Sequence, residues 1–319
     1  MYKNEEVTLM SKIIKKLPVP IVGLMLGLAA CGNLVLSYGE TYRNIFGLLS
    51  AIILVLVLVK IIMYPRQVKE SLDNPVVASV FPTLSMGIML LSTYLKPYSS
   101  PLALGMWFIG LILHIILIIS FTVKYIIGFN IKKVFPSWFI VYVGIVVASV
   151  TSPAFDMTKI GQMAFWFGFI SYIILLPLVL YRVIKVKNIP EPAQPTIVIL
   201  SAPASLCLVG YMNAFQEKNM LIVYLLLALS QATYIYILTT LPKLLRLKFY
   251  PSYSAFTFPL VISGIALKVT NSFLINIGNT NYLFNHLVKL EEIVAVVMVL
   301  YVLSRYISFL LSNKEVIKV

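Results

Sequence analysis

Long apolar segments recur along the whole chain of 319 residues, and this recurrence constrains the fold more than any other feature. A helix needs about 20 apolar residues to cross a bilayer. With that window the sequence predicts ten spans, at 17–38, 44–65, 75–95, 102–127, 136–155, 160–184, 195–215, 220–242, 251–273 and 287–311. The connections between them are too short to hold a soluble domain.

Composition supports this interpretation. Hydrophobic residues make up 60% of the chain and charged residues 11%, whereas soluble domains carry about 25% charged residues. We therefore expect an all-α integral membrane protein, with a cytoplasmic tail at 1–16, a transmembrane domain at 17–311 and a second cytoplasmic tail at 312–319. Cys31 and Cys207 both fall in apolar runs, which favours packing over a disulfide or a metal site.

The basic residues predict the orientation. Seventeen Lys and Arg fall in the two tails and in alternate connections, while the opposite side holds only four. Cytoplasmic segments carry such an excess, so both termini are expected in the cytoplasm and the chain in the cell membrane. The net charge of +14 then follows from topology, and nucleic-acid binding is not indicated. The four on the opposite side are Arg43, Lys96, Lys159 and Lys218.

Pro, Gly, Ser and Thr concentrate in the odd-numbered spans, and the even-numbered spans are more apolar. Small and polar residues belong where helices pack closely or face water. The pattern predicts five helical hairpins, each with one inner helix, around a central pore. Close packing without a lumen is the alternative. The candidate pore-lining or kink residues are Gly23, Gly27, Pro82, Ser149, Pro203, Pro259 and Gly264.

Few ionisable residues lie at membrane depth, where they are costly and usually functional. His114 fits a neutral imidazole bonded to a neighbouring helix, because a proton relay would need a partner carboxylate. Glu292 follows Lys289 by three residues, which predicts an ion pair within the last helix. Neither HExxH, GxSxG nor a Gly-rich phosphate loop occurs, so no catalytic residue, metal or cofactor is expected.

Lys268 lies about 15 Å outward of Phe258 along the ninth span and about 80° around it. It is therefore not on the face that carries the ring. It would either reach the outer interface, where it would supply a charge at the outer mouth, or contact a neighbouring subunit.

The stretch PSYSAFTFPLVISGIAL at 251–267 places Phe258 and Pro259 near the bilayer centre. Pro259 lacks an N–H and would crowd the carbonyl of Ala255, so a kink is predicted. A kinked helix is tolerated in a membrane where protein or water satisfies the freed carbonyl. A large apolar ring at this level would block a narrow pore, or it would be an ordinary packing residue.

Five segments occur together in one family: LPVPIVGLMLGLAACGN, FPTLSMG, FPSW, LSAPASLCLVGY and AFTFPL. In matching order they resemble the tellurite-resistance/dicarboxylate transporter (TDT) family, which includes bacterial TehA proteins, fungal malate and sulfite transporters and plant slow anion channels. The resemblance implies a ten-helix protomer with its own pore, assembled as a homotrimer. It also implies a gate at Phe258, pore-helix glycines at Gly23 and Gly27, and kinking prolines at Pro82 and Pro203.

The function expected from this resemblance is passive transport of small anions through a pore gated by Phe258. A secondary carrier for C4-dicarboxylates such as malate, for tellurite or for sulfite, with or without proton coupling, is the alternative. The preference for anions rests on the resemblance, since a carbonyl exposed by a proline kink would suit cations.

Overall fold

The computed structural model describes residues 10–279 and 282–312. The predicted tails at 1–16 and 312–319 therefore lie largely outside the described residues. Every regular element in the described part is helical. Lys16 Nζ donates to the carbonyl of Phe309 at 2.6 Å, so the two described ends of the chain meet at one end of the bundle.

Nine helical spans in the described part are long and apolar enough to cross a membrane. Their bounds differ from the predicted ones by five residues or fewer. They are α2–η1 (Ile21–Tyr38), α3 (Glu40–Met63), α5–α6 (Pro75–Leu95), α7–η2 (Ser100–Ile126), α10–η6 (Thr158–Val186), η7–α11 (Glu191–Ala214), α12 (Met220–Leu244), η8–α13 (Pro251–Asn276) and α14 (Tyr282–Leu311). The short α4 (Pro65–Ser71) follows α3.

The predicted span at 136–155 is not one continuous helix. It consists of α8 (Trp138–Tyr142), η4 (Gly144–Val146), α9 (Val147–Thr151) and η5 (Ser152–Phe155). Gly144 and Pro153 lower the helix propensity of a segment that is otherwise rich in β-branched residues. Gly144 also permits close packing, because a Cβ there would meet Met86 Sδ at 2.7 Å.

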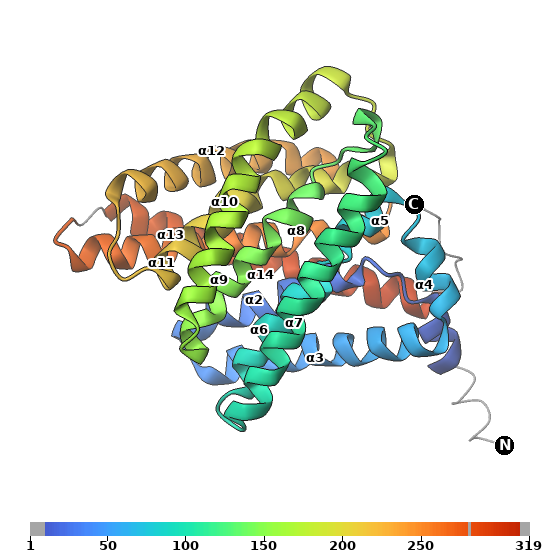
Figure 1. Cartoon of the computed structure of the whole chain (residues 1–319), viewed down its shortest axis with the longest axis horizontal. Coiled ribbons are helices and arrows are strands. Elements are labelled where there is room, and N and C mark those ends of the chain that lie inside the picture. The colour runs from blue at the N-terminus through green and yellow to red at the C-terminus, as the bar shows by residue number, and fades with distance from the viewer. Residues whose placement is uncertain (1–9, 280–281, 313–319) are drawn as a thin grey trace.

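Burial alternates along the chain. The four spans α2–η1, α5–α6, η7–α11 and η8–α13 have 67–89% of their apolar windows buried, whereas α3, α7–η2, α10–η6, α12 and α14 have only 28–33%. Figure 1 shows α3, α7, α10 and α12 around the outside of the bundle. The protein is therefore built from an inner set and an outer set of helices, as the distribution of small residues predicted.

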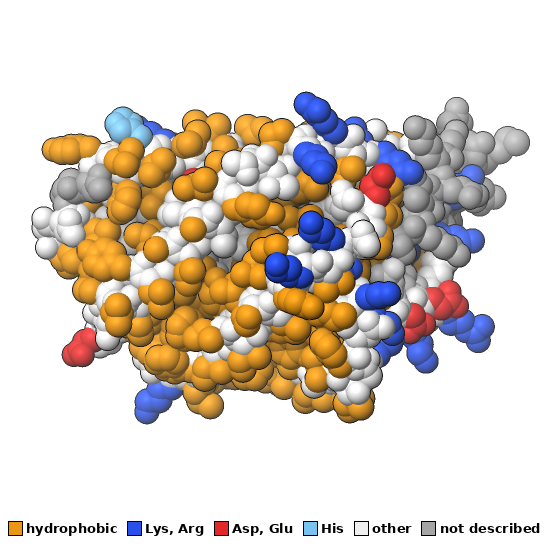
Figure 2. Space-filling view, turned by 90° about the horizontal axis from the view of Figure 1, so that it is seen from above, with side chains coloured by type: hydrophobic (Ala, Val, Ile, Leu, Met, Phe, Trp, Pro, Cys, Tyr) orange, Lys and Arg blue, Asp and Glu red, His pale blue; other side chains and the backbone are white. Residues whose placement is uncertain are grey.

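The outer helices present apolar side chains to the surroundings. Figure 2 shows a face covered largely by hydrophobic side chains, with most of its Lys and Arg gathered toward one end. Ile62 on α3, Ile112 on α7 and Ile174 on α10 are examples of strongly exposed residues of the outer helices. Such a belt is stable only in contact with lipid or other apolar protein, so the chain is a multi-pass membrane protein.

Prolines mark the starts of the inner α-helices. Pro82 is the N-cap of α6, while Pro203 and Pro259 lie in the first turns of α11 and α13. The first turn has N–H groups without helical partners, so a proline there removes no helical hydrogen bond. The kink predicted within a continuous helix at Pro259 is thus a junction between a 3₁₀ segment, η8 (Pro251–Phe256), and α13 (Phe258–Asn276).

Candidate functional site: Phe258 between two cavities

Two glycines of α2 let the junction of η8 and α13 approach closely. A Cβ on Gly23 would lie 2.9 Å from Ser254 Cβ, and a Cβ on Gly27 would lie 2.4 Å from Thr257 Oγ1. The hydroxyl of Thr257 also donates to the carbonyl of Gly23 at 3.1 Å. These contacts hold the backbone beside Phe258 against α2.

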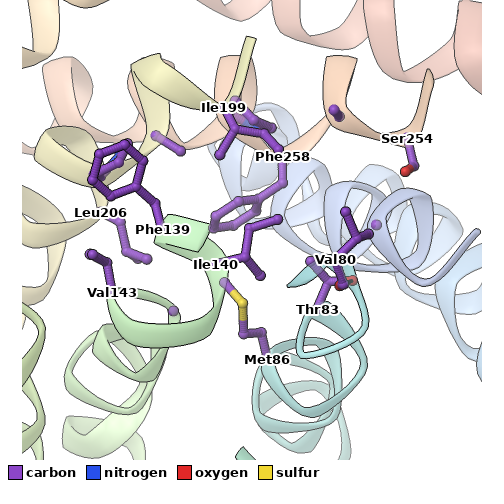
Figure 3. A pocket seen from close by; sticks show the side chains of 16 residues that line it. Val80, Thr83, Met86, Phe139, Ile140, Val143, Ile199, Leu206, Ser254 and Phe258 are labelled. Atoms are coloured by element: carbon purple, nitrogen blue, oxygen red, sulfur yellow. Dashed lines mark hydrogen bonds between the residues drawn. The ribbon is translucent and has the colours of Figure 1, made fainter. Parts of the chain in front are cut away.

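On one side of the Phe258 ring lies a cavity of about 30 Å³, which we call the apolar cavity. Figure 3 shows Phe258 extending between Ile140 and Ile199, with Phe139 close by. A volume of this size holds one or two water molecules. The other labelled lining residues are Val80, Thr83, Met86, Val143, Leu206 and Ser254.

On the other side of Phe258 lies a larger cavity of about 280 Å³, the charged cavity. Arg43 is its single charged lining residue in the described part of the chain. Polar groups accompany it on several inner helices, and Ile262, Ile265 and Val269 continue the wall along α13. Its polar lining residues are Asn33, Thr93, Thr151 and Asn213.

A third cavity, of about 490 Å³, lies beyond the apolar cavity and includes Lys15, Lys16 and Lys60. We call it the lysine cavity. Lys60 Nζ donates to the carbonyl of Lys15 at 2.9 Å. Desolvation by burial lowers the pKa of Lys16 from its ordinary value. Glu70 also lines this cavity, so its lining is basic on balance but not exclusively so.

The three cavities follow one another along the same inner helices. On η8–α13 the lysine cavity touches Pro251, the apolar cavity Ser254, and the charged cavity Ile262. Phe258 lines both the apolar and the charged cavity. Its side chain therefore stands between them, and it is almost completely buried.

The other pore-lining or kink residues proposed from sequence divide into three groups. Gly23, Pro203 and Pro259 line the apolar cavity together with Phe258. Gly27 and Pro82 lie next to lining residues without being part of either cavity wall.

Ser149 and Gly264 face other helices. Ser149 Oγ donates to the carbonyl of Gly161 on α10 at 2.6 Å. A Cβ on Gly264 would meet Glu291 Cβ and Leu34 at 3.6 Å, so this glycine faces α14 and α2.

Lys268 is paired within the protomer. Its Nζ lies 2.5 Å from Glu292 Oε1 and donates to the carbonyl of Leu34 at 2.9 Å, and it lines neither the apolar nor the charged cavity. Tyr38 donates to the other oxygen of Glu292 at 2.7 Å. The ion pair of Glu292 with Lys289 predicted from their spacing is therefore wrong, because Lys268 on α13 reaches the carboxylate instead.

His114 is completely buried and bonded on both ring nitrogens. Nδ1 lies 2.8 Å from Ser85 Oγ, and the N–H on Nε2 donates a hydrogen bond to the carbonyl of Val141 at 3.1 Å. This is the structural role that the sequence favoured. Cys31 and Cys207 are buried and free. Within the described ranges, no group of three His, Cys, Asp or Glu side chains is placed to hold a metal ion.

Sequence reasoning missed Arg43 as a cavity residue. It was counted only among the few basic residues of the predicted outer side. A signal was present in Gly32 and Gly47, since two glycines on neighbouring spans indicate close approach of a large side chain. That side chain is Tyr94, which lies 2.3 Å from a Cβ placed on Gly32 and 2.5 Å from one placed on Gly47.

Buried inner helices, a lipid-exposed outer set and successive cavities define a membrane transport protein. The sequence model of the SLAC1 family, described as voltage-dependent anion channels, matches residues 16–307. The chain therefore belongs to this family of anion channels and transporters, which confirms the TDT resemblance and the expectation of a transport protein rather than an enzyme. An uncharacterized transporter of Methanocaldococcus jannaschii is 27% identical over 192 residues, which cover 56% of this chain and 56% of that protein.

Proposed function

We propose that the protein lets small anions cross the membrane passively, through a pore that the ring of Phe258 closes. The observation that carries this proposal is the position of Phe258 in the walls of both the apolar and the charged cavity. An ion that passes an apolar ring in a narrow lumen loses hydration without gaining a polar partner. The ring is thus a barrier to ion flow in the conformation described here.

Charge along the path favours anions. Arg43 lies in the charged cavity, and Lys15, Lys16 and Lys60 lie in the lysine cavity. No acidic residue of the described part lines the apolar or the charged cavity. Cavities lined by one sign of charge raise the local concentration of the opposite ion.

The architecture that we propose around this path consists of five helical hairpins, each pairing an inner with an outer helix. The alternating burial of successive spans supports it. The lysine cavity would face the cytoplasm, with both termini on that side, because basic residues concentrate on that side in the sequence. We further propose a homotrimer with one pore in each protomer, on the basis of the family resemblance.

A carrier for C4-dicarboxylates, tellurite or sulfite is the second candidate. Two cavities separated by one occluding side chain would also suit alternating access, and the relative from Methanocaldococcus jannaschii is described as a transporter. Proton coupling has little support, since both ring nitrogens of His114 are engaged by Ser85 and Val141.

Replacing Phe258 tests the proposal. In liposomes, Phe258→Ala should raise the flux of chloride and nitrate by about tenfold or more, since each 1.4 kcal/mol removed from a barrier is a factor of ten. Phe167→Ala is the matched control, because Phe167 is exposed on α10 and lines neither cavity.

The form of the flux separates channel from carrier. A channel gives a current that reverses at the Nernst potential of the anion and does not respond to a pH gradient. Saturable, proton-driven uptake of malate would contradict the channel and support the carrier. Equal anion flux in Phe258→Ala, Phe167→Ala and the unmodified protein would assign Phe258 to packing alone.

A further inference from the structure

Arg43 is the charged group of the charged cavity, and its guanidinium is held in a fixed position. Its Nε donates to Asn33 Oδ1 at 3.1 Å, and its Nη2 donates to the carbonyl of Thr93 at 3.3 Å. The guanidinium carbon lies 4.0 Å from the centre of the Tyr94 ring. All of these partners are uncharged, so they orient the cation without neutralising it.

Two glycines make room for the aromatic ring that packs against the Arg43 guanidinium. Gly32 and Gly47 leave the space that the Tyr94 side chain fills between α2, α3 and α6. The hydroxyl of Tyr94 donates to the carbonyl of Ala29 at 2.6 Å, which fixes the ring. A fixed ring presents its face to the guanidinium, and stacking on it limits the rotamers that Arg43 adopts.

Arg43 keeps unused donors. A guanidinium carries five N–H groups, and two of them are engaged by Asn33 and the carbonyl of Thr93. Within the described part of the chain, both N–H groups on Nη1 and one on Nη2 have no hydrogen-bond partner. The ion pairs of the described residues join Lys124 to Asp73 and Lys268 to Glu292, and neither involves Arg43.

Asn213 adds a donor from another inner helix. It lines the same cavity from α11, and its Nδ2 uses one N–H to reach the carbonyl of Val150 at 2.9 Å. A side-chain amide has two such N–H groups, and the second has no partner among the described residues. The cavity thus offers free N–H groups of an unneutralised guanidinium together with a neutral donor, and its volume of about 280 Å³ accommodates a small ion with its water.

We propose that Arg43 is the anion-binding site of the charged cavity and that it selects planar oxyanions, carboxylates and nitrate, over spherical halides. Two parallel N–H groups match two oxygens of a planar anion, whereas a halide accepts them at a single centre. The proposal deepens the anion transport proposed above, because it names the site and the ligand class for that path.

Binding to the purified protein in detergent tests the site without reliance on flux. Nitrate and acetate should raise the thermal unfolding midpoint in a saturable way, and chloride should require about tenfold or more higher concentration for the same shift. Arg43→Gln should abolish the nitrate and acetate shifts. Arg43→Lys keeps the charge but not the fork, so it should bind nitrate and chloride alike.

Lys159→Gln is the matched control, since it removes one exposed positive charge from α10, and Lys159 lines neither the apolar nor the charged cavity. It should keep the nitrate shift of the unmodified protein. Size-exclusion profiles establish that each variant is folded. If Arg43→Gln does not fold, the comparison of nitrate with chloride in Arg43→Lys tests the proposal instead. A nitrate shift retained in Arg43→Gln, or equal affinities for nitrate and chloride in the unmodified protein, would overturn the proposal.

Phe258→Ala separates this inference from the gate. Phe258 also lines the charged cavity, so the comparison is made within that variant: its nitrate shift should be lost when Arg43→Gln is added, because the partners of Arg43 lie on α2 and α6. Unchanged flux in Phe258→Ala with intact nitrate binding refutes the gate and leaves the Arg43 site standing. Raised flux without any nitrate binding in the unmodified protein refutes the Arg43 site and leaves the gate standing.

Discussion

The contact between Gly27 and Thr257 gives a quantitative prediction for the region of the proposed gate. In Gly27→Ala, the new Cβ would lie 2.4 Å from Thr257 Oγ1, 2.5 Å from Thr257 Cβ and 3.1 Å from the backbone nitrogen of Phe258. Ordinary contact needs at least 3.4 Å, so α2 and the junction must separate by about 1 Å. The atoms that the new methyl group meets belong to buried backbone or to the short side chain of Thr257, so they cannot make room by a change of side-chain rotamer.

The expected loss of stability has two parts. Inserting a methyl group into a packed interior costs about 1–3 kcal/mol. The contact of the Thr257 hydroxyl with the carbonyl of Gly23 at 3.1 Å is lengthened in addition, which costs little more, because the same hydroxyl keeps its shorter bond to the carbonyl of Ser254 at 2.7 Å. Separating α2 from the start of α13 also widens the ring of inner helices at the level of Phe258. Gly27→Ala should therefore unfold more easily and leak more anion.

Thermal unfolding in detergent and chloride efflux from liposomes measure both effects. Gly105→Ala is the control, because no heavy atom lies within 4 Å of a Cβ at that position in α7. Adding Thr257→Gly to Gly27→Ala removes the two closest atoms, so it should recover part of the lost stability. The reasoning is refuted if Gly27→Ala matches Gly105→Ala in both unfolding midpoint and efflux.

Two further predictions concern buried polar contacts. Trp107→Phe removes the N–H donor that reaches Thr151 Oγ1 at 2.7 Å. It should lower the free energy of unfolding by about 1–3 kcal/mol in a denaturation assay. Unchanged stability would show that the Thr151 hydroxyl does not depend on this donor. Glu292→Gln should destabilise the protein by weakening the pair with Lys268, whose side chain is 27% exposed against 7% for Glu292. The double variant Lys268→Met/Glu292→Leu should lose less stability than its two single variants together, by about 0.5–3 kcal/mol, and strict additivity would contradict the pairing.

Much of the helical framework follows from the sequence because bilayer thickness and hydropathy act locally. The bounds of α5–α6 (Pro75–Leu95) coincide with the predicted span at 75–95. The division into inner and outer helices also follows from the sequence, since glycine and serine indicate close helix packing even when the neighbouring helices are not known. The break at 143–147 does not follow, because the run of β-branched residues around Gly144 has the hydropathy of a continuous span.

Side-chain partners depend on how each helix is rotated about its axis, which one sequence does not determine. Ser149 and Gly264 are small residues of the kind expected to line a pore, yet they face α10 and α14. Glu292 has a basic residue within one turn, but its partner is 24 positions away. For Arg43 the sequence carries only the indirect signal of Gly32 and Gly47, because the groups that hold its guanidinium come from α2 and α6.

The contact between Thr257 and Gly23 bears on how fast the proposed gate at Phe258 would open. The backbone on both sides of Phe258 is held, because the Thr257 hydroxyl lies 3.1 Å from the carbonyl of Gly23 on α2 and the Ser263 hydroxyl lies 3.3 Å from the carbonyl of Ser201 on η7. The freedom left to Phe258 is rotation about its own side-chain bonds, which is a local motion rather than a movement of whole helices. Exposed side chains rotate within nanoseconds, and collective domain motions take microseconds to milliseconds. The buried ring of Phe258, which lines the apolar cavity with Ile140 and Ile199, should rotate on a timescale between these limits, so single openings of the proposed gate would be brief, with lifetimes set by packing around one aromatic side chain.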